Sequence, residues 1–149
     1  MENISVFFIS FLLSFLTVDA KKRQAIKVGE ATVQHWAAGM PNGLRSGNGD
    51  HYLIKLYVNT AKPVEITKVW IGGKEVPCRI ESFASIPPKT TAFGDSLVLD
   101  YNTADGENKN PSPTPPKYKG VAIVEYTVAG KAYYFAVKEF RKLPDYIGL

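Results

Sequence analysis

Apolar and polar residues alternate along much of the chain after residue 20. In residues 51–60, HYLIKLYVNT, Ile54 and Leu56 share one face, whereas Leu53 and Lys55 share the other. A period of two is that of a β-strand, and the β-branched and aromatic residues that fill this stretch favour the same structure. Residues 51–60 are therefore expected to form a strand.

Other segments with this pattern are separated by turn residues. VEITKVWI (64–71) and KEVPCRI (74–80) flank Gly72-Gly73, which indicates a β-hairpin. Pro77 has no amide hydrogen, so the second of these strands is expected at a sheet edge or with a bulge. The remaining expected strands are SLVLDY (96–101), GVAIVEYTV (120–128), KAYYFAVKEF (131–140), and AIKVGEATVQHWA (25–37), the last being one strand or two broken at Gly29.

About seven strands without a sustained helical period favour an all-β fold, an antiparallel immunoglobulin-like β-sandwich. A small closed barrel is the alternative. Two long segments are expected outside the strands, the glycine-rich residues 39–50 and residues 102–120, here called the Pro-rich segment. The Pro-rich segment favours extended polyproline II geometry and is expected to be a stiff loop that crosses between the two sheets.

The N-terminal residues carry an uncharged apolar run, ISVFFISFLLSFLTV, at positions 4–18. This run is short for a transmembrane helix, which needs about 20 apolar residues. The small-residue ending at Ala20 predicts a signal peptide over residues 1–20, followed by a single β-sandwich domain over residues 21–149. The expected location is exported, in the periplasm or at the cell surface. Because the cations of residues 21–23 follow the run rather than precede it, an uncleaved membrane anchor is the alternative.

Charge and cysteine content narrow the possible partners. Removal of residues 1–20 takes away Glu2 and Asp19, so the net charge rises from +4 to +6. The cations are scattered rather than clustered on one element, which argues against a nucleic-acid partner. The single cysteine, Cys78, forms no internal disulfide and alternates with Val76 and Ile80, so we expect a buried structural thiol.

The only histidines, His35 and His51, frame the glycine-rich segment and raise the question of a metal site. With Met40 and Cys78 they match the residue types of a blue-copper centre, but no histidine follows Cys78 as cupredoxin-like proteins require. Copper or zinc held by His35, His51 and a carboxylate such as Asp50 is the alternative function. No nucleophile motif is present. We therefore predict no catalytic residue and no cofactor, and a hydrolase with an unrecognised carboxylate site ranks third.

Binding is the function that the sequence favours, because exposed tyrosine and tryptophan beside loops are typical contact residues. Tyr133 and Tyr134 are adjacent, so one of them must lie on an outer sheet face or against a covering loop. The predicted function is a non-enzymatic interaction module of the cell envelope, whose partner is another protein or an envelope glycan. The candidate contact residues are Trp36, Met40, Asn42, Arg45, Asn48 and Tyr134.

In PPKYKGVAIVEYTVAGKAYYFAVKEFRKL (115–143), a proline-rich stretch is followed by Tyr-x-Gly and then by Gly-Lys-x-Tyr-Tyr. This stretch resembles the ending of a family of small, uncharacterised exported proteins of Bacteroidota, in which a proline-rich loop leads into a Tyr-x-Gly strand and a Gly-Lys-x-Tyr-Tyr hairpin. VQHWAAGMPNGLRSGNGDHYLIKLYV (33–58) is similar to their first half. The resemblance implies an immunoglobulin-like fold and an envelope location, and it implies no activity and no site residues.

Overall fold

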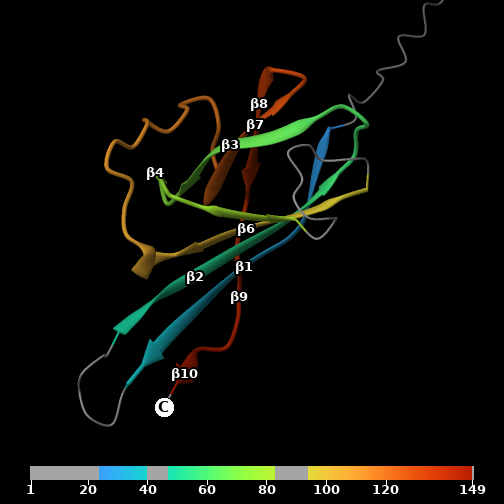
Figure 1. The fold of residues 1–149 in the computed structure, drawn as a ribbon. Coiled ribbons are helices and arrows are strands. Elements are labelled where there is room, and N and C mark those ends of the chain that lie inside the picture. Colours follow the sequence, from blue (N-terminus) through green and yellow to red (C-terminus); the bar gives the residue numbers. More distant parts are fainter. Residues whose placement is uncertain (1–23, 40–46, 83–93, 149) are drawn as a thin grey trace, which may run out of the picture.

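A computed structural model describes residues 24–39, 47–82 and 94–148, and in these ranges the chain forms two sheets (Figure 1). The six-stranded sheet runs in the order β10 (Tyr146–Gly148), β1 (Ile26–Ala38), β2 (Gly47–Val58), β6 (Ser96–Asn102), β5 (Arg79–Ser82), and β9 (Arg141–Lys142) also pairs with β1. The four-stranded sheet runs in the order β4 (Lys74–Glu75), β3 (Val64–Ile71), β7 (Ala122–Val128), β8 (Lys131–Val137). The all-β, two-sheet prediction is confirmed.

The helical structure in the described ranges is one 3₁₀-turn, η1 (Thr103–Asp105), and no helix there has the length and apolar character to cross a bilayer. The expected signal peptide, residues 1–20, lies outside the described residues.

The core fills the space between the two sheets and follows from the period-two pattern. Alternate residues of β2 and β6 face it, including Leu56 at 0% exposure and Leu99 at 1%. Opposite them lie residues of β3, β7 and β8, including Val69 and the fully buried Val124. Removal of these side chains from water is the main favourable contribution to folding.

β1 is a single strand with a bulge, which decides between the two expectations for residues 25–37. Val28 pairs with Leu56, but Glu30 pairs with Lys55, so Gly29 is the extra residue. A glycine suits this position because a Cβ there would lie 2.2 Å from the Tyr57 ring.

Residues 74–80 do not form one strand, and this prediction is wrong. β4 pairs with β3 in the four-stranded sheet, whereas β5 pairs with β6 in the six-stranded sheet. Pro77 stands between them, where its missing amide hydrogen ends the first ladder and the chain crosses to the other sheet.

Cys78 lies in this crossing and packs, partly buried, against the core. Burial, and to a lesser degree the charge of Asp100, raises the pKa of the Cys78 thiol to about 12, so it stays protonated at neutral pH. Ile80 is 49% exposed, so the expected apolar face does not continue into β5.

The six-stranded sheet is not purely antiparallel, because the C-terminal residues pair in parallel with β1. The expected strand 131–140 ends at Val137, and residues beyond it form β9 and β10. Leu143 N donates to Val33 O at 2.8 Å, and Gly39 N donates to Gly148 O at 3.3 Å. The tail thus pairs with the backbone along the otherwise open edge of β1.

The Pro-rich segment leads from β6 to β7, and so crosses between the sheets as predicted. It also covers the outer face of the four-stranded sheet. Trp70, only 2% exposed, donates from Nε1 to Ser112 O at 3.0 Å, and Thr114 Oγ1 donates to Gly73 O at 2.7 Å. The Pro-rich segment therefore covers Trp70 on the outer face of the four-stranded sheet.

The substitution Leu56→Ala tests the core. Because Leu56 is fully buried, its truncation is expected to lower the free energy of unfolding by about 2 to 5 kcal/mol in urea denaturation followed by circular dichroism. The matched control is Ile80→Ala at a half-exposed position of the same sheet, with an expected change within about 0.5 kcal/mol. Equal losses from the two substitutions would contradict this assignment of the core.

Candidate functional site

One end of the six-stranded sheet projects beyond the rest of the molecule (Figure 1). β6 pairs with β2 only from His51 to Tyr57, so the preceding residues of β2 pair with β1 alone. β10 joins β1 at this end, and its three residues pair with Trp36, Ala37 and Ala38. We call residues 36–38, 47–49 and 146–148 the distal ribbon. Residues 47–50 were expected to be loop but belong to β2, because they pair with β1.

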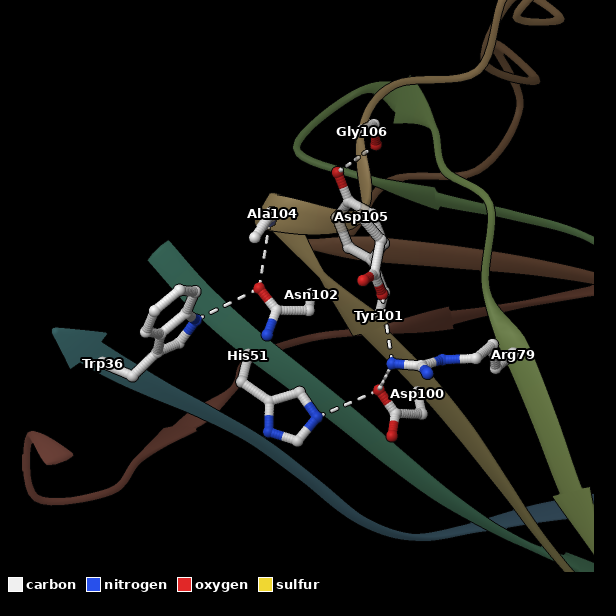
Figure 2. A network of polar contacts seen from close by, with 9 residues as sticks. All are labelled: Trp36, His51, Arg79, Asp100, Tyr101, Asn102, Ala104, Asp105 and Gly106. Atoms are coloured by element: carbon white, nitrogen blue, oxygen red, sulfur yellow. Dashed lines mark hydrogen bonds and ion pairs between the residues drawn. The ribbon is translucent and has the colours of Figure 1, made fainter. Parts of the chain in front are cut away.

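Trp36 of the distal ribbon is held by a hydrogen bond and by its contact with Gly49. It pairs with Gly49, where a Cβ would lie 3.2 Å from Trp36 Nε1 and 2.5 Å from Thr103 Oγ1. The glycine therefore makes room for the indole. Trp36 Nε1 donates to Asn102 Oδ1 at 3.1 Å, and the same oxygen accepts from Ala104 N at 3.0 Å (Figure 2).

His51 lies on the same outer face as Trp36, because it pairs with Gln34. Its Nε2 is 2.9 Å from Asp100 Oδ1 (Figure 2). Arg79 Nη2 lies 3.9 Å from that oxygen and donates to Asp105 Oδ2 at 3.1 Å. These contacts form a row of polar side chains across β2, β6 and β5 that continues from Trp36.

His35 lies on the opposite face, where it pairs with Asp50. Its Nδ1 is 3.0 Å from Asp50 Oδ1. Cross-strand partners share a face and neighbours along a strand alternate, so the imidazoles of His35 and His51 point away from each other. The described residues contain no group of three or more histidine, cysteine, aspartate or glutamate side chains that could hold a metal ion. The geometry does not support one ion shared by His35 and His51.

The His51–Asp100 contact resembles the orienting half of a nucleophilic triad. A triad needs a hydroxyl or thiol hydrogen-bonded to the imidazole. Among the described residues, no serine, threonine or cysteine is hydrogen-bonded to His51.

The other predicted contact residues lie in different places. Asn48 is in the distal ribbon, exposed, on the face of His35. Met40, Asn42 and Arg45 lie outside the described residues.

Tyr134 is not part of the distal ribbon. It lies on the outer face of the four-stranded sheet, where its ring stacks on Tyr118 of the Pro-rich segment at 5.0 Å. Its hydroxyl donates to Glu125, and this hydrogen bond raises the pKa of Tyr134. The hydrogen bond that Thr67 donates to Glu125 and, to a lesser degree, the one from Tyr134 lower the pKa of the Glu125 carboxyl group. Tyr134 therefore packs against a covering loop, one of the two arrangements that its alternation with Tyr133 allowed.

Two exposed apolar residues of the distal ribbon were not predicted as contact residues from the sequence. Tyr146 is 61% exposed and Ile147 is 75% exposed, the highest values among the large hydrophobic side chains of the described residues. Tyr146 pairs with Trp36, and Ile147 pairs with Ala37, so one residue lies on each face of the ribbon. Only their parallel pairing with β1 brings them to Trp36.

Comparisons of the chain with protein-family models, with curated proteins and with solved structures find no match. The fold and the site therefore define only the class of protein. It is an all-β protein with a β-sandwich-like pair of sheets and an exposed aromatic ribbon at one end.

The substitution Asn102→Ala tests how Trp36 is held. Loss of the acceptor Oδ1 is expected to shift the Trp36 indole N–H resonance and to speed its exchange with solvent, as measured by ¹H–¹⁵N NMR. The indole of Trp70, which donates to Ser112 O, is the internal control and should not change. The free energy of unfolding should fall by about 1 kcal/mol, because the η1 cap is lost as well. An unchanged Trp36 indole signal would contradict the contact.

Proposed function

We propose that this chain is a non-enzymatic, exported binding module of the cell envelope, built on an immunoglobulin-like sandwich, and that the distal ribbon contacts its partner. The exposure of Tyr146 and Ile147 beside Trp36 is the observation that carries this proposal. Export and kinship with the Bacteroidota proteins belong to the same proposal and are supported by the apolar residues 4–18 and by the stretches quoted above.

The chemistry of the distal ribbon suits recognition of a partner. Tyrosine and tryptophan bring large contact areas and few rotatable bonds, and they are enriched where binding energy concentrates. The hydrogen bond to Asn102 and the packing against Gly49 fix the orientation of the Trp36 ring before binding. This lowers the entropy cost of association. Of the two partner classes, another protein is favoured over an envelope glycan, because two exposed side chains on opposite faces suit a partner that grips the ribbon.

A binding role is supported over metal handling, and over catalysis that uses a histidine base, by the contacts of the two histidines. His51 is committed to Asp100 on one face and His35 to Asp50 on the other. Neither contact positions a nucleophile, and the two rings do not converge. These contacts therefore favour a binding role over the metal-handling alternative.

Capture of partners from envelope extracts by the immobilised full chain tests the proposal. The amount of partner captured by the double variant Tyr146→Ala, Ile147→Ala should be at least about tenfold lower than that captured by the wild type. The reason is that hot-spot aromatic and apolar residues dominate interface energy. Mass spectrometry of the eluates provides the measurement.

The matched control removes two exposed apolar side chains elsewhere, Tyr133→Ala and Ile80→Ala, at 37% and 49% exposure. This control should capture as much partner as the wild type. Full capture by the ribbon variant, or equal loss in the control, would overturn the assignment of the distal ribbon.

A further inference from the structure

A cleft lies between the two sheets, and we propose that it binds a ring of a neutral saccharide. This inter-sheet cleft has a volume of about 380 Å³. Its lining comes from the core-side face of the six-stranded sheet, from the turn between β3 and β4, and from the Pro-rich segment, with the residues used below being Tyr52, Ile71, Lys74, Tyr101, Glu107 and Asn108.

Aromatic side chains form one wall of the cleft. The rings of Tyr52 and Tyr101 lie nearly parallel, with centroids 6.2 Å apart and an interplanar angle of 19°. Phe140 packs edge-on against Tyr52 at 5.1 Å and fixes its ring. The hydroxyl of Tyr101 donates to Gly106 O at 3.4 Å, whereas that of Tyr52 has no hydrogen-bond partner among the described residues. Tyr101 is only 6% exposed, so the half-buried Tyr52 offers the apolar surface for the C–H face of a sugar ring and one free hydroxyl.

Charged side chains of both signs line the cleft, because Glu75 joins Lys74 and Glu107 there, and Glu75 Oε2 accepts from Ser112 N. Lys74 Nζ lies 3.6 Å from Glu107 Oε1, and both side chains are largely exposed. An anion would meet the two carboxylates, which disfavours a negatively charged ligand. A sugar hydroxyl both donates and accepts, and can therefore satisfy the carboxylate and the ammonium together. Asn108 adds a further donor and acceptor beside them.

The size of the cleft agrees with a small saccharide. Ligand pockets are mostly apolar with a few polar groups and range from about 300 to 1,000 Å³, so 380 Å³ suits a mono- or disaccharide unit. Trp36, Tyr146 and Ile147 do not line the cleft, so the saccharide site does not depend on the distal ribbon.

Saturation-transfer NMR with the full chain tests the saccharide site, with maltose, cellobiose, lactose and N,N′-diacetylchitobiose as probes at millimolar concentration. At least one disaccharide should bind and should shift the backbone amide of Asn108. Glu107→Ala should weaken that binding about tenfold, because it removes a charged hydrogen-bond acceptor. Tyr52→Phe, which keeps the packed ring and removes only the hydroxyl, should weaken it several-fold.

The matched control is Glu65→Ala, which removes an exposed glutamate outside the cleft and should leave saccharide binding unchanged. The proposal is overturned if none of the four disaccharides binds the wild type, or if Glu65→Ala weakens binding as much as Glu107→Ala. Because partner capture depends on Tyr146 and Ile147, and Glu107→Ala leaves those residues intact, failure of the saccharide site and failure of the distal ribbon are distinguishable.

Discussion

The rest of the structure depends on the pairing of β1 with β2, which runs from Ile26 opposite Val58 to Ala38 opposite Gly47. β6 pairs with β2 on one side of this pair, and the C-terminal tail pairs with β1 on the other. The extra residue at Gly29 changes which positions of β1 face the core: even-numbered positions do so before the bulge and odd-numbered positions after it. In a β-ladder, a shift by one residue moves every side chain to the opposite face.

Both candidate surfaces follow from this register. With the bulge at Gly29, Trp36 lies on the outer face, where Asn102 can accept from its indole, and His51 lies on the same face beside Asp100. The core-side face carries Tyr52, which becomes a wall of the inter-sheet cleft where β2 runs past the core. A glycine with no side chain thus decides which chemistry each face presents.

Local pattern predicted the strands that alternate strongly, and failed where distant residues decide. β3 matches residues 64–71, because its alternation and the flanking turn residues are local signals. The division of residues 74–80 between two sheets depends on which neighbour each half meets, and period alone does not encode this. The tail around Tyr146 has no alternation, and its strands exist only because the edge of β1 offers unpaired backbone groups. The metal hypothesis for His35 and His51 rested on closeness in the loop, whereas the register sets their directions.

Cross-strand nuclear Overhauser effects in the full chain test the central claim most directly, because they report which residues of β1 and β2 lie opposite each other. Contacts are expected between the backbones of Gln34 and His51 and between those of His35 and Asp50. Contacts that instead place His35 opposite His51 would mean a ladder shifted by one residue. That result would return both imidazoles to one face and contradict the assignment of Trp36 to the outer surface.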